Sequence, residues 1–249
     1  MRIATWNIGG GILGESHQLH GTAALDYHAK VISDSQLDVL CLQEAHVYES
    51  GVDQVATLAE ACGFNHWHSI PISSSHLAPD AYLALGVLSR FPIAGNTYLQ
   101  FPNPGLESLG PNGERWTLFD KGLLRSEIQE PSSPFTLINA HCFPLHYFGV
   151  KATDPSLTAI WHPLRRTLED AHTRRTLACV DLNSPDIDHL LPNLKLWSYS
   201  ELLPRVPTTP KGVQQDFLLA SADMGVPIKA EIVPTLSDHA LCWADLPTG

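Results

Sequence analysis

Short apolar runs rich in valine, isoleucine and leucine recur along the whole chain. Their lengths suit buried β-strands better than helices. They predict strands at residues 3–6, 39–42, 83–88, 123–128, 135–138, 176–180, 217–219 and 241–243. Sheets are therefore expected to form most of the core.

Three segments between these runs have apolar residues at helical spacing. They predict helices at residues 22–36, 52–62 and 156–173. Gly63 is placed to end the second helix, because glycine readily adopts the left-handed conformation that follows a last turn. Pro163 must start, kink or divide the third, because proline lacks a backbone N–H.

The later strands follow one another with few helices between them, which excludes a regular alternation of strand and helix. A mixed or antiparallel arrangement is therefore expected, with two sheets packed face to face and helices on their outer surfaces. No repeat, linker or composition shift divides the 249 residues. We expect residues 1–249 to form a single α/β catalytic domain.

The formal net charge of -11 argues against binding nucleic acid by general phosphate neutralisation. It does not exclude a nuclease, because a site for a divalent cation is itself acidic. The five cysteines show no CxxC spacing, and Cys41, Cys179 and Cys242 lie inside apolar runs. With no signal-like start and no membrane-length apolar run, we expect a cytoplasmic monomer without integral membrane association.

Polar groups follow the ends of several predicted strands. Each alone is typical of a turn or a solvated loop. Together they predict one polar rim along a sheet edge. The set comprises Asn7, Gln43-Glu44, His141, Asp181-Leu182-Asn183 and Ser237-Asp238-His239.

The ordered motifs TWN, LQE, LSRFPI, INAH, DLN and SDH extend from Thr5 to His239. In this order they resemble the endonuclease/exonuclease/phosphatase superfamily. The resemblance implies a four-layer α/β sandwich with Mg²⁺, or Mn²⁺ in its place, at one edge of the sheets. It implies Glu44 as the principal metal ligand, with Asn7 and Asp238 beside it. Carboxylate and amide oxygens suit this hard cation.

The same resemblance implies the catalytic roles. Asp181 matches the residue that orients and activates the attacking water, and Asn183 matches a donor to the phosphate. His239 would stabilise charge in the transition state, with Asp216 holding its ring. His141 matches a general acid near the leaving-group oxygen.

Substrate contacts are expected from Asn7, Lys121, His146 and Tyr147. The histidine and tyrosine could stack on a base or sugar, or could equally form the apolar edge of a loop. Two departures, Gly9 in place of an acid and His46 after Glu44-Ala45, disfavour repair of abasic DNA.

The leading hypothesis is a Mg²⁺-dependent phosphodiesterase or nuclease acting on DNA or another nucleotide-derived ester. A phosphatase for soluble sugar, inositol or nucleotide phosphates is the close alternative. A sphingomyelinase-like phospholipid hydrolase is disfavoured, because no basic amphipathic helix is evident. A catalytically inactive binding module is the least favoured hypothesis, because the metal-site and histidine positions are all present.

Overall fold

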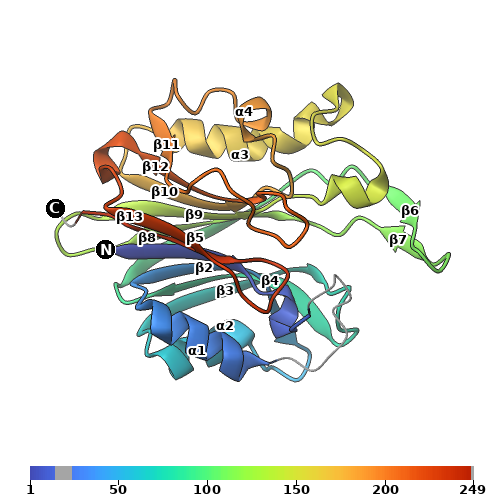
Figure 1. The fold of residues 1–249 in the computed structure, drawn as a ribbon, viewed down its shortest axis with the longest axis horizontal. Coiled ribbons are helices and arrows are strands. Elements are labelled where there is room, and N and C mark those ends of the chain that lie inside the picture. Colours follow the sequence, from blue (N-terminus) through green and yellow to red (C-terminus); the bar gives the residue numbers. More distant parts are fainter. Residues whose placement is uncertain (15–23, 248–249) are drawn as a thin grey trace.

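Two six-stranded mixed sheets pack face to face in the computed structural model, which describes residues 1–14 and 24–247 (Figure 1). The first sheet has the order β13 (Lys229–Val233), β14 (Leu241–Asp245), β1 (Arg2–Asn7), β2 (Val39–Tyr48), β4 (Ala81–Ser89), β3 (His66–Ser74). The second has the order β11 (Tyr199–Glu201), β12 (Asp216–Ser221), β10 (Thr176–Asp181), β9 (Phe135–His141), β8 (Gly122–Ile128), β5 (Ile93–Gln100). A separate hairpin joins β6 (Glu107–Leu109) to β7 (Arg115–Thr117).

The central strands bury both of their faces. In β1, Ile3 packs between the sheets against residues such as Leu85 and Leu137. Its neighbours Ala4 and Trp6 point the other way, into the layer beneath the helices. Burial on both faces explains why these strands read as continuous apolar runs rather than alternating ones.

Helices cover the outer face of each sheet, as Figure 1 shows. Those designated α1 (Leu25–Ser35) and α2 (Gln54–Cys62) lie on the first sheet, while α3 (Thr158–Ala171) and α4 (Ile187–Leu190) lie on the second. The inward face of α3 carries Ile160, Leu164 and Leu168, spaced four residues apart. The predicted four-layer α/β sandwich is confirmed.

The predicted helices are found close to their expected bounds. Asp53 caps α2 by accepting the backbone N–H groups of Val55 and Ala56, and Gly63 ends it with a φ of 68°. The third helix is continuous through Pro163. The first two residues of the predicted helix 22–36 lie outside the described residues.

Short 3₁₀ turns complete the connections: η1 (Gly9–Gly11), η2 (Leu145–Phe148), η3 (Pro155–Leu157) and η4 (Ala222–Met224). All five cysteines are free, and Cys41, Cys179 and Cys242 are buried as predicted. Among the described helices, none is both long enough and apolar enough to cross a bilayer.

Candidate active site

Strand register brings the predicted polar residues to one end of the sandwich. Parallel pairing of β1 with β2 sets Asn7 beside Gln43, and parallel pairing of β9 with β10 sets His141 beside Asp181. Antiparallel pairing of β10 with β12 then sets Asp181 beside Asp216. Polar residues far apart in the sequence thus meet along one rim.

Glu44 reaches this rim because β2 is irregular where it occurs. The register between β2 and β4 shifts between Leu42 and Ala45, and Glu44 has a φ of 53°. A bulge of this kind redirects a side chain out of the normal strand alternation. Asn183 has the same φ of 53°, so two side chains of the site sit in a backbone conformation that non-glycine residues rarely adopt.

A buried amide network fixes the two sheets to each other beneath Glu44. The Nε2 of Gln43 donates to Asn139 Oδ1 at 2.7 Å and to Thr5 Oγ1 at 3.0 Å. The Nδ2 of Asn139 donates to the carbonyl oxygens of Leu42 at 2.9 Å and Gly86 at 2.8 Å. Asn139 belongs to the second sheet and its partners to the first. Sequence reasoning missed Asn139, although a polar residue within an apolar run was the available signal.

Asn7 and Asn183 hold Asp181 from two sides. Asn7 Nδ2 donates to Asp181 Oδ2 at 2.9 Å, and the backbone N–H of Asn183 donates to Asp181 Oδ1 at 3.0 Å. Burial, together with the nearby charge of Asp216, raises the pKa of Asp181 to about 7, against the opposing effects of His239 and Asn7. A carboxyl group that titrates near neutrality is suited to proton abstraction.

His239 and Asp216 form a buried ion pair. His239 Nδ1 lies 2.8 Å from Asp216 Oδ2, and Asp216 is fully buried. Burial opposes the charge on His239, but Asp216, Asp181 and Asp238 outweigh it and raise the pKa of His239 well above its usual value. The ring is therefore a fixed imidazolium facing the site.

Lys121, His141 and Glu44 form a second charged group. The Nζ of Lys121 lies 3.1 Å from His141 Nε2 and 3.5 Å from Glu44 Oε1, and its side chain is only 3% exposed. Burial and the Lys121 charge hold the pKa of His141 well below its usual value. Burial opposes ionisation of Glu44, but Lys121 and His141 lower its pKa below the usual range. Glu44 is thus ionised and His141 neutral.

Of the residues expected to bind a metal, Glu44 belongs to this group. Asp238 is linked to Asn7 through Ser237, whose Oγ lies 3.4 Å from Asp238 Oδ1 and 3.5 Å from the Asn7 carbonyl oxygen. Burial and the Glu44 charge raise the pKa of Asp238. Neighbouring carboxylates with an amide oxygen from Asn7 fit a hard divalent cation that would relieve their repulsion. The ligand atoms of Asp181, Asp216 and His239 also lie within 4.8 Å of one another. That trio suits a cation less well, because His239 is positively charged and already bonded to Asp216.

His76 is a further residue that sequence reasoning missed. It lies between β3 and β4, its ring is 5.7 Å from that of Phe119, and its charge also acts on Glu44 and Asp238. The serine-rich segment around it has the composition of an ordinary loop, so no sequence signal pointed to it.

The predicted substrate contacts His146 and Tyr147 lie apart from the hydrogen-bonded rim. Both are exposed on η2, with their ring centroids 4.2 Å apart. Trp116 of β7 meets Tyr147 edge to face at 6.1 Å. His146 lines a pocket that also includes Asn183, so this aromatic group borders the site without joining its charge network.

The glycine turn that contains the departure at Gly9 packs against the departure at His46 through the neighbouring residue, Gly10. Gly10 has a φ of 67°, and a Cβ there would lie 2.3 Å from Cε1 of His46. The His46 ring is held by Ser75, whose Oγ lies 2.8 Å from Nε2. A side chain at Gly10 would therefore clash with the His46 ring in its present position.

Comparisons with known proteins identify the family of the chain. The sequence matches the Endonuclease/Exonuclease/phosphatase family over residues 4–239. An endonuclease/exonuclease/phosphatase structure from Beutenbergia cavernae aligns with a TM-score of 0.73 at 18% identity, covering 100% of this chain and 72% of that chain. A search of curated proteins finds no significant match.

Two further solved structures align over the full length of both chains. The mannosyl-6-phosphatase of Bacteroides thetaiotaomicron has a TM-score of 0.64 at 11% identity, covering 100% of each chain. A 3′ phosphatase from Neisseria bound to product DNA hairpin has a TM-score of 0.61 at 17% identity, again covering 100% of each chain. The chain belongs to the endonuclease/exonuclease/phosphatase family and is a phosphoester hydrolase.

Proposed function

We propose that this hydrolase depends on Mg²⁺ and cleaves a phosphodiester of DNA or another nucleotide-derived ester. One observation carries the proposal: a buried imidazolium, His239, faces a carboxyl group that titrates near neutrality, Asp181, beside the ionised Glu44. Such a site combines a general base with a fixed positive charge that stabilises the phosphoryl group in the transition state.

Glu44, Asp238 and Asn7 would hold the metal ion. When bound, Mg²⁺ supplies positive charge that polarises the phosphoryl group and orients the ester. Mn²⁺ offers the same kind of oxygen coordination and would substitute. Asn7 also donates to Asp181 at 2.9 Å, so a single amide couples the metal ligands to the base.

Asp181 would take the proton of the attacking water at one of its carboxylate oxygens. Its two hydrogen bonds, from Asn7 and Asn183, fix the direction in which the remaining lone pairs point. Asn183 and His239 would donate to the phosphate oxygens, and Asp216 would keep His239 charged and oriented.

The leaving-group oxygen would receive its proton from the pair formed by His141 and Lys121. His141 is neutral at rest, whereas Lys121 Nζ lies 3.1 Å from its Nε2. Lys121 Nζ also lies 3.2 Å from His141 Nδ1, and its charge opposes protonation of His141 at rest. Negative charge from a bound phosphate would favour the protonated form of His141.

A phosphatase acting on soluble sugar, inositol or nucleotide phosphates is the second candidate. It is favoured by the names of the two full-length structural matches, a mannosyl-6-phosphatase and a 3′ phosphatase. The same residues would serve either reaction, because only the leaving group differs.

A substrate panel with Mg²⁺ and with EDTA tests the proposal. It should contain single-stranded, duplex and abasic DNA, RNA, sphingomyelin, nucleotides and inositol phosphates. We expect EDTA-sensitive cleavage to be strongest with a nucleotide-derived ester. A clear preference for a sugar or inositol monophosphate would select the second candidate, and turnover unaffected by EDTA would refute metal dependence.

A further inference from the structure

A pocket of about 470 Å³ opens directly beside Asn183. Three connections form it: the segment after β9 that includes η2, the turn after β10, and the segment that leads into β12. Gln215, next to the catalytic-site Asp216, also lines it. The pocket is therefore continuous with the phosphate side of the rim, and its volume matches sites for small molecules.

Two of the six lysines line this pocket, although the chain has a net charge of -11. The six lysines of the sequence are at positions 30, 121, 151, 195, 211 and 229. Lys121 is in the site, and Lys151 and Lys211 both line the pocket. Neither pocket lysine forms an ion pair with a carboxylate among the described residues, whereas Lys30 and Lys229 do.

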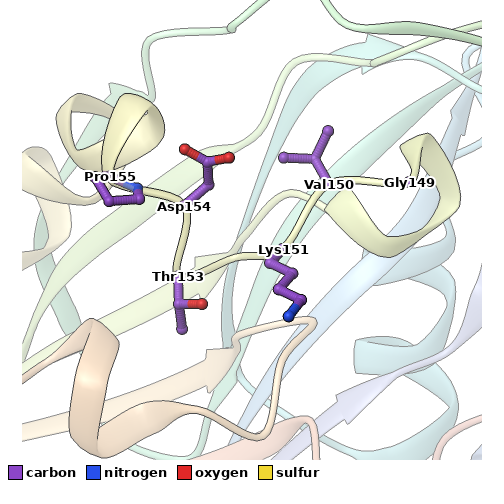
Figure 2. A pocket seen from close by; sticks show the side chains of 6 residues that line it. All are labelled: Gly149, Val150, Lys151, Thr153, Asp154 and Pro155. Carbon is purple, nitrogen blue, oxygen red and sulfur yellow. The ribbon is translucent and has the colours of Figure 1, made fainter.

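Lys151 and Lys211 reach the pocket lining from two separate segments. Figure 2 shows Lys151 and Thr153 extending to one side of their loop, while Val150 and Asp154 extend to the other. Lys211 comes from a distant segment, where its Nζ lies 4.5 Å from the centre of the Tyr147 ring and contacts the Tyr147 hydroxyl. Tyr147 thus holds one ammonium group in place at the pocket.

The apolar part of the lining includes Leu145, Pro185 and Val213, and Asp186 is the one carboxylate among its described residues. We propose that this pocket binds a second phosphate of a small organic substrate, held by Lys151 and Lys211. Its carbon skeleton, a nucleoside or a sugar, lies over the apolar lining. This inference rests on the proposed function, with the reacting phosphate at Asn183 and His239, and it selects a bisphosphorylated small molecule over duplex DNA.

Binding of matched ligand pairs tests the pocket separately from turnover. Titration calorimetry in EDTA would compare adenosine 3′,5′-bisphosphate with adenosine 5′-monophosphate, and fructose 1,6-bisphosphate with fructose 6-phosphate. The proteins would be the wild type, the double variant Lys151→Met/Lys211→Met, and the double control Lys30→Met/Lys195→Met, which removes the same charge from exposed positions outside the pocket.

In at least one pair, the bisphosphate should bind wild type about tenfold more tightly, as expected for charge-assisted contacts. The double variant should lose this preference and the control should keep it, and rising salt should weaken it. The pair that shows the preference identifies the carbon skeleton. Absence of a preference in both pairs, or its survival in the double variant, overturns the inference. A preference without any Mg²⁺-supported turnover would retain the pocket and reject the proposed function.

Discussion

Replacing Asp216 by asparagine tests whether His239 acts as a fixed imidazolium. The substitution keeps a hydrogen-bonding side chain of nearly the same size but removes the negative charge 2.8 Å from His239 Nδ1. The charge of Asp216 helps to raise the pKa of His239, so the variant should lower that pKa. Removing one partner of a buried ion pair leaves the other charge uncompensated and costs about 3–5 kcal/mol of stability.

The assay is kcat/KM for the preferred phosphoester with Mg²⁺, measured from pH 6 to pH 9. We expect the basic limb of the profile to move to lower pH, because the pKa of His239 falls when the Asp216 charge is removed. At pH values above the shifted basic limb, kcat/KM should fall by about 10²–10³-fold, which is the usual effect of losing one preorganised donor. Asp188→Asn, at a side chain that is 85% exposed, controls for the change in net charge.

The same substitution has a defined effect on stability. Because the pKa of His239 is raised in the folded protein, the charged ring stabilises the fold fully below its unfolded value of about 6.5. That contribution is lost as pH rises through the raised pKa. Urea unfolding should therefore show the largest deficit for Asp216→Asn near pH 6. An unchanged pH profile together with unchanged stability would refute the role assigned to the pair.

Three further changes test other parts of the site. Gly10→Ala should lower the free energy of unfolding, measured in urea, by about 1–3 kcal/mol, because the new Cβ meets the His46 ring. The control Gly51→Ala should lower it by less, because residue 51 also has a positive φ but has open space around it. In EDTA, the raised pKa of Asp181 should make stability fall as pH rises from about 4 to 7, and Asp181→Asn should remove this slope. Asn139→Ala should lower the free energy of unfolding by about 1–3 kcal/mol, because Gln43 and two carbonyl oxygens lose their hydrogen-bond partner. It should also lower kcat, because Glu44 is no longer held in position. Stability and kcat equal to those of wild type would contradict the positioning role.

Sequence patterns predicted the central strands because those strands are buried on both faces. Residues 39–42 and 176–180, for example, lie inside β2 and β10. The edge strand β5 was missed because its burial is patchy along its length and its apolar residues do not form a run. Strands β3 and β13 are likewise only partly buried at the edges of the first sheet.

The site was predictable in its parts but not in its electrostatics. Motifs placed Glu44, Asp181 and His239 on one rim. The prediction that the strand of residues 39–42 ends before Glu44 was wrong, because β2 continues to Tyr48 and a bulge turns Glu44 towards the rim. The contact between Lys121 and His141 depends on three-dimensional packing across β8 and β9, which no spacing encodes. The neutral state of His141 follows from its burial and from that contact, which together lower its pKa, and so emerged only from the structure.

The central claim is that the rim around Glu44 holds a divalent cation used to hydrolyse a phosphoester. The most direct measurement is phosphoester turnover by EDTA-treated wild type and Glu44→Gln, before and after addition of Mg²⁺. Glutamine keeps the size of the side chain and removes its charge. Our account predicts that Mg²⁺ restores turnover to wild type and fails to restore it to Glu44→Gln. Turnover in EDTA equal to that with Mg²⁺, or full activity of Glu44→Gln, would contradict it.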